Sequence, residues 1–177
     1  MDFFYFLVKD ENSGWEPIFH ADYFESTGFL YGTLGALAIG LLCALIFYFG
    51  LCNNKNNVSA ATKTNWLIFL LVAGIAAYFY ADLALIGDPE TTNPGTFSFC
   101  ENNNRKLIDI TQGQPQPVVA QYTAEYQKIK NNIQKGNDVA FTFDITTAFL
   151  AIVFYFLFSL VIKRFTIAGK SIPMLKP

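Results

Sequence analysis

The sequence is poor in the residues that build metal sites and catalytic centres. It has one histidine, His20, and three cysteines, Cys43, Cys52 and Cys100, and no two cysteines form a C-x-x-C pair. A structural zinc site needs four nitrogen or sulfur ligands, which these positions cannot bring together. We therefore expect no metal and no cofactor, and we interpret the cysteines as small apolar side chains.

Motifs of the common enzyme classes are also missing. The sequence has no P-loop, no Rossmann glycine pattern, no G-x-S-x-G nucleophile elbow and no H-E-x-x-H pair. A lone histidine in an aromatic segment does not favour a catalytic triad. With 12 Lys and Arg against 14 Asp and Glu, there is no basic surface for nucleic acid. The sequence therefore predicts a protein that is not an enzyme and does not bind nucleic acid.

Long apolar runs are what the sequence has in abundance. Hydrophobic residues make up 53% of the chain, charged residues only 15%. Three runs, residues 28–51, 66–87 and 139–162, are each long enough to cross a hydrocarbon core of about 30 Å as a helix. We therefore expect an all-α membrane protein with three transmembrane helices in contact with lipid.

The charges on either side of these runs predict an orientation. The 52–65 loop and the 163–177 tail hold lysine or arginine and no acid, whereas the 1–27 tail holds six acids and one lysine. By the positive-inside rule, the 52–65 loop and the C-terminal tail are cytoplasmic. The N-terminal tail, with its interfacial aromatic residues, and the long 88–138 loop are then external. We expect insertion in the inner (plasma) membrane.

Small residues recur at every fourth position of the first two runs, and this spacing favours close helix packing. On a helix they form stripes that let a second backbone approach closely. The spacing does not distinguish contacts within the chain from contacts between copies. The stripes are Gly28, Gly32, Ala36, Gly40 and Ala44 in the first run, and Ala73, Ala77 and Ala81 in the second.

The long external loop contains a predicted amphipathic helix at residues 118–135. Its apolar stripe must be covered by the N-terminal tail, by another copy or by a partner. Two short segments earlier in the loop, Phe97–Cys100 and Leu107–Ile110, read as β-like runs. The stripe consists of Val119, Tyr122, Tyr126, Ile129 and Ile133.

Two acids, Asp82 and Asp144, lie inside apolar runs, at nearly the same depth if the second and third helices are antiparallel. Tyr78 and Thr147 are one helical turn from them. These residues could line an ion path through a ring of copies. The alternative, in which each acid hydrogen-bonds a nearby polar group, is favoured because both acids are near the membrane edge.

We therefore expect a small multi-pass subunit that anchors or scaffolds a larger, oligomeric membrane assembly. Its partners are copies of itself, other membrane-complex proteins, or both. The alternative is a homo-oligomeric ion channel or permeabilising pore with an acidic outer mouth. The inner half of the third run offers only Ser159 as a polar lining residue, which ranks the scaffold above the pore.

Overall fold

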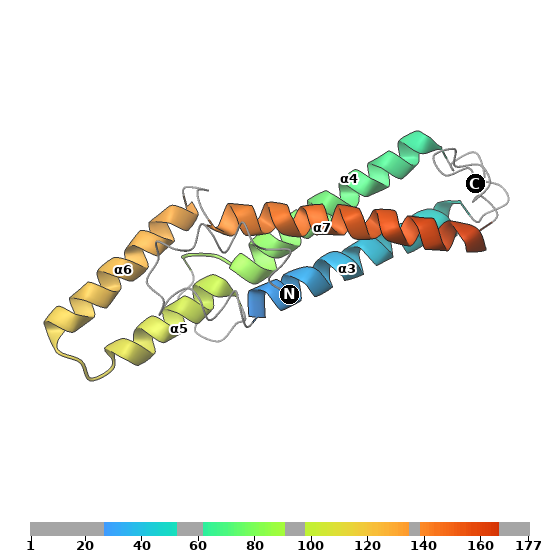
Figure 1. Cartoon of the computed structure of the whole chain (residues 1–177). Coiled ribbons are helices and arrows are strands. Elements are labelled where there is room, and N and C mark those ends of the chain that lie inside the picture. The colour runs from blue at the N-terminus through green and yellow to red at the C-terminus, as the bar shows by residue number, and fades with distance from the viewer. Residues whose placement is uncertain (1–26, 53–61, 91–97, 135–138, 167–177) are drawn as a thin grey trace. The chain divides into compact units, whose positions relative to one another are not determined.

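The computed structural model of the chain describes residues 27–52, 62–90, 98–134 and 139–166. The secondary structure in these ranges is entirely helical, so the all-α class is confirmed (Figure 1). The expectations for the N-terminal tail up to residue 26 and for the C-terminal tail from residue 167 lie outside the described residues. The same holds for most of the 52–65 loop.

Three helices are long and apolar enough to span a membrane, as the sequence predicted. With the exception of Ile108, the exposed large apolar side chains of the described residues belong to these helices. Such a surface suits hydrocarbon and not water, so the protein is integral to a membrane. The spans are Phe29–Leu51 (α3, Phe29–Leu45, with η4, Ile46–Leu51), Lys63–Ile86 (α4, Lys63–Tyr80, with η6, Ala81–Ile86) and Val139–Phe165 (α7, Val139–Ile162, with η7, Lys163–Phe165).

The first two spans end in wider π-helical turns. The amide of Cys52 donates to the carbonyl of Phe47 at 3.0 Å, and the amide of Gly87 donates to the carbonyl of Asp82 at 2.9 Å. Gly87 then leaves the helix with a φ of 80°, a conformation that glycine adopts without a Cβ penalty. The second span therefore stops at Gly87.

The chain divides into two compact units. The first contains Met1–Gly32 and Phe79–Thr146, and the second contains Thr33–Tyr78 and Thr147–Pro177. The first unit includes the helices of the long loop and the ends of the spans that adjoin them in the sequence, and the second contains the rest of the spans. Each unit has its own set of contacts.

The core of the second unit is built from aromatic rings. Trp66 of α4 and Tyr155 of α7 lie with ring centroids 5.6 Å apart. The indole Nε1 of Trp66 donates to Oγ of Ser159 at 3.2 Å, and the hydroxyl of Tyr155 donates to the Trp66 carbonyl at 3.3 Å. These bonds satisfy polar groups that would otherwise be unpaired in an apolar setting, and they join α4 to α7.

Close backbone packing joins α3 to α7 in the same unit. A Cβ at Gly40 would lie 2.9 Å from the Tyr155 nitrogen and 3.0 Å from the Ala151 oxygen. Only glycine allows the two backbones to come this near. At Gly74 of α4, by contrast, an added Cβ would meet the end of the Ile152 side chain at 2.9 Å.

In the first unit, α5 (Phe99–Thr111) and α6 (Gln116–Gln134) form an antiparallel hairpin (Figure 1). The prediction of β-like runs in this region is wrong, because Phe99, Cys100 and Leu107–Ile110 belong to α5; Phe97 lies outside the described residues. Ser98 caps α5 by accepting from the Glu101 amide, while the Glu101 carboxylate accepts from the Ser98 amide. This capping box satisfies amides of the first turn and fixes where α5 begins.

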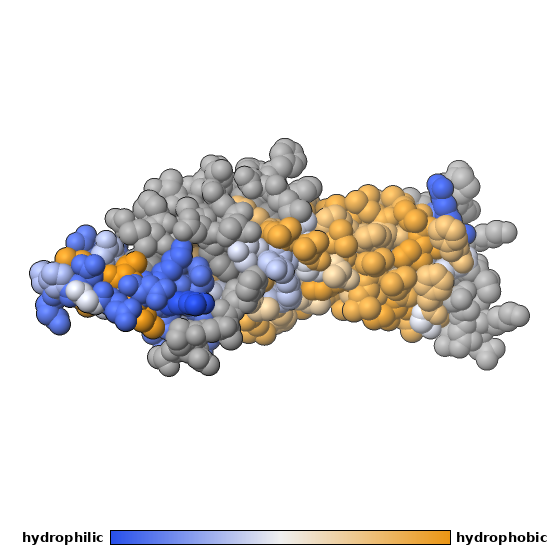
Figure 2. Space-filling model, turned by 90° about the horizontal axis from the view of Figure 1, so that it is seen from below, coloured by the Kyte–Doolittle hydropathy of each residue, from blue (hydrophilic) through white to orange (hydrophobic). Residues whose placement is uncertain are grey.

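The surfaces of the two kinds of helix differ. The coloured part of α5 and α6 is mainly hydrophilic, whereas the spanning helices are mainly hydrophobic (Figure 2). The hairpin is therefore suited to water and the spans to lipid. Gln134 at the end of α6 donates to Glu90, which follows the second span, at 2.9 Å.

Candidate functional site

Part of the apolar stripe of α6 faces α5, because Tyr126, Ile129 and Ile133 line a pocket with residues of that helix. Tyr126 and Ile129 are buried, and the other stripe residues, Val119, Tyr122 and Ile133, are half-buried. Helix α5 was not among the covers expected from the sequence, which were the N-terminal tail, another copy or a partner. Helix α5 thus covers part of this stripe within one chain.

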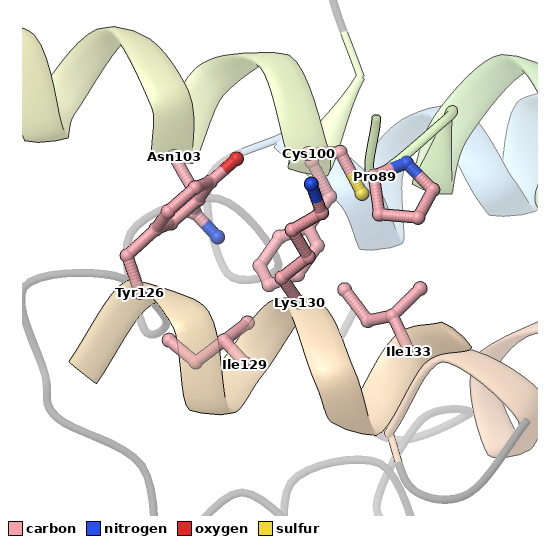
Figure 3. Close-up of a pocket in the computed structure, with 8 residues that line it drawn as sticks. Pro89, Cys100, Asn103, Tyr126, Ile129, Lys130 and Ile133 are labelled. Atoms are coloured by element: carbon pink, nitrogen blue, oxygen red, sulfur yellow. The ribbon is translucent and has the colours of Figure 1, made fainter. Parts of the chain in front are cut away.

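A small pocket lies between the two helices, and we call it the α5–α6 pocket (Figure 3). Its empty volume is about 180 Å³, part of which is open to solvent. Helix α5 contributes Phe99, Cys100 and Asn103. Pro89 closes one edge, and α6 contributes Tyr126, Ile129, Lys130 and Ile133.

Asn103 is the unusual residue of this pocket. Its side chain is only 1% exposed, yet neither Nδ2 nor Oδ1 has a hydrogen-bond partner among the residues that the structure describes. Buried amides are nearly always paired, because an unpaired donor or acceptor costs about 1–3 kcal/mol. A buried, unpaired carboxamide in a pocket is therefore a candidate for binding a further group.

The thiol of Cys100 is held in its neutral form. Burial, together with the negative charges of Glu101, Asp88 and Asp82, raises the pKa of Cys100 to about 12. Lys130 acts in the opposite direction, but more weakly. Burial also raises the pKa of the Tyr126 hydroxyl above its usual value. At neutral pH the pocket therefore presents neither a thiolate nor a phenolate.

The two membrane acids belong to the first unit. Asp144 is buried, at 2% exposure, and its Oδ1 has no partner within the described ranges, whereas Asp82 is half-buried. The two carboxyl groups are near enough to repel each other. The half-buried Tyr78 and the buried Thr147, expected beside them, belong to the second unit.

The small residues of the two predicted stripes are all buried within the single chain. Neither stripe is therefore exposed on the surface of the chain. These are Gly28, Gly32, Ala36, Gly40 and Ala44 of the first span, and Ala73, Ala77 and Ala81 of the second.

Sequence reasoning missed the pocket as a whole. Asn103 lies in the run Asn102–Asn104, between the two segments that were predicted to be β-like, and it becomes a pocket residue through the pairing of α5 with α6. The signal that could have found α5 is the Ser98–Glu101 spacing of a capping box.

No three His, Cys, Asp or Glu side chains gather into a possible metal site within residues 27–52, 62–90, 98–134 and 139–166. The chain matches no protein-family model, no curated protein and no solved structure.

Proposed function

We propose that the protein is a membrane subunit that anchors or scaffolds a larger assembly. The observation that carries this proposal is the α5–α6 hairpin, a folded polar element inserted between two membrane-spanning helices. Because both of its ends continue into spans, the hairpin is held at the membrane surface. An element fixed in this way can dock a partner without paying the full ordering cost of a free loop.

An exposed apolar side chain on α5 supports the same proposal. Ile108 is 49% exposed. Among the large apolar side chains of the described residues, it alone is exposed outside the three spans. Unlike the others, it lies on a polar helix and not on a span. An exposed isoleucine on a polar helix is a suitable contact for a partner.

The orientation is part of the proposal. The basic 52–65 loop and the basic C-terminal tail favour the cytoplasmic side of an inner (plasma) membrane, which places the hairpin outside. A reporter fused after Pro177 should then be active in the cytoplasm. Activity on the outer side would overturn this orientation.

Co-isolation of bound proteins tests the role of the hairpin. We expect the tagged protein, extracted with its surrounding lipid, to bring down partner chains or further copies. Ile108→Asn should weaken this association. Lys128→Gln on α6 is the matched control, because the Lys128 side chain is 69% exposed and bonds to Glu125 of its own helix. Equal recovery with both variants would remove Ile108 from the interface.

The second candidate is a cation-conducting pore, which the buried Asp144 favours. Ionisable residues inside spans are costly and commonly line functional paths. Ser159 weakens this candidate, because it is fully buried and accepts a hydrogen bond from Trp66, so it does not line a pore within the chain.

Conductance in planar bilayers tests the pore. The pore hypothesis expects cation-selective current that falls when Asp82→Asn and Asp144→Asn are combined. Current that is indifferent to both changes would exclude a role for these acids. The absence of current from the purified protein would exclude the pore itself.

A further inference from the structure

The α5–α6 pocket contains polar side-chain atoms that have no hydrogen-bond partner among the described residues. Asn103 reaches from α5 toward α6 (Figure 3), and both polar atoms of its carboxamide are without partners in the described residues. Lys130 extends from α6 toward α5 in the same view and lines the same pocket. Together they offer two kinds of donor and one acceptor within one cavity.

The charges around the pocket favour a neutral occupant. An anion would be attracted by Lys130 but repelled by Glu101, Asp88 and Asp82, whose fields reach the pocket at Cys100. A cation would be repelled by the ammonium of Lys130, which lines the pocket itself. A neutral group with its own donor and acceptor meets neither repulsion.

The size and the walls of the pocket restrict the occupant further. Phe99, Ile129, Ile133 and Pro89 form apolar walls. The polar groups of the lining side chains are those of Asn103, Lys130, Tyr126 and Cys100. Because the empty volume of about 180 Å³ includes open solvent, the enclosed space is small and excludes a large cofactor.

We infer that the α5–α6 pocket binds a neutral amide group of a partner polypeptide. The amide N–H donates to Oδ1 of Asn103, and the amide carbonyl accepts from Nδ2 of Asn103 and from Nζ of Lys130. An Asn or Gln side chain supplies both groups from one carboxamide. A main chain supplies them from the N–H and C=O of one residue, because the N–H and C=O of a single trans peptide point in opposite directions. The inference rests on the proposed function, because it gives the chemistry of the partner that the hairpin docks.

The test uses the whole chain in lipid nanodiscs, with ¹⁵N-labelled asparagine. The Asn103 side-chain signal is assigned by its loss in Asn103→Leu. Acetamide is the probe for a side-chain amide, and N-acetylglycine methylamide is the probe for a main-chain amide. Acetone, which only accepts, and acetate, which is an anion, are the controls.

We expect saturable shifts of the Asn103 signal with at least one amide, and binding at least about tenfold weaker with acetone and with acetate. The amide that binds more tightly identifies the source of the group. Lys130→Met should weaken amide binding several-fold, whereas Lys128→Met should not. Acetate binding as tightly as the amides, or no saturable shift with either amide, would overturn the inference.

A stability measurement separates an amide site from a water site. If Asn103 is unpaired in the free chain, Asn103→Leu should leave the unfolding midpoint unchanged or raise it, while abolishing the response to amides. A clear fall in the midpoint would mean that water already satisfies Asn103, and it would overturn the inference.

The two proposals can fail separately. A chain that binds amides but is isolated alone from its membrane would contradict the anchoring role and leave the chemistry of the pocket standing. A chain isolated with partners, whose pocket ignores amides, would contradict only the inference.

Discussion

The indole of Trp66 and the hydroxyl of Ser159 form a buried hydrogen bond of 3.2 Å between α4 and α7. A double-mutant cycle with Trp66→Phe and Ser159→Ala should give a coupling free energy of about 0.6 kcal/mol, the usual size for such bonds in membrane proteins. The measurement is the reversible unfolding free energy in mixed micelles. Strictly additive single changes would show that this bond does not stabilise the fold.

The close approach of α3 to α7 at Gly40 predicts graded effects of Gly→Ala substitutions on the unfolding free energy. Gly40→Ala should lower the unfolding free energy by about 1–3 kcal/mol, because the new Cβ would meet backbone atoms that cannot move aside. Gly50→Ala is the control within the same span, since its nearest neighbour would be Cγ2 of Ile46 at 3.8 Å. Gly74→Ala should be intermediate, because the Ile152 side chain can rotate. Equal effects at all three glycines would contradict the packing of α3 on α7.

The cap of α5 predicts a local loss of protection. Ser98→Ala removes the acceptor for the Glu101 amide and should cost about 1 kcal/mol. Amide hydrogen exchange within Phe99–Thr111 should accelerate accordingly, while exchange within α7 stays unchanged. Glu101→Gln is the matched control, because glutamine also completes a capping box. Faster exchange throughout the protein would show that Ser98 has a wider role than capping.

The raised pKa of Cys100 predicts slow alkylation. In a variant with Cys43→Ala and Cys52→Ala, a shift from the usual 9.0 to about 12 lowers the thiolate fraction at pH 8 about a thousand-fold relative to the unfolded chain. Iodoacetamide should therefore label the folded protein far more slowly than the SDS-unfolded one. Equal labelling rates in folded and unfolded protein at pH 8 would place the thiol in solvent.

The same shift has a defined effect on stability. The pKa of Cys100 is higher in the folded chain than in the unfolded chain. Its contribution to the free energy of unfolding is therefore complete below pH 9 and is lost as the pH rises toward 12.

The spanning helices were predictable because their signal is local. A long run of apolar residues such as Gly28–Leu51 satisfies the length and composition of a span without reference to the rest of the chain. The α6 helix was predictable for the same reason, since its stripe recurs every three or four residues; it begins at Gln116, two residues before the predicted start. The π-helical ends of the first two spans were not predicted.

The α5–α6 pocket could not be read from the sequence because it depends on contacts between two helices. Cys100 reads as an isolated thiol and Asn103 as one of several loop asparagines. Both become pocket residues only when α5 packs on the Tyr126 and Ile129 face of α6. The stripe of α6 indicated that a cover was needed, but the polar composition of α5 concealed that the chain supplies it.

The anchoring role rests on the protein being bound to other chains in its membrane. The most direct measurement is the native mass of the protein extracted together with its lipid, followed by identification of every chain in the particle. The account predicts a mass well above that of one 19.8 kDa chain, made up of partner proteins, further copies or both. A particle that holds a single copy and no other protein would contradict it.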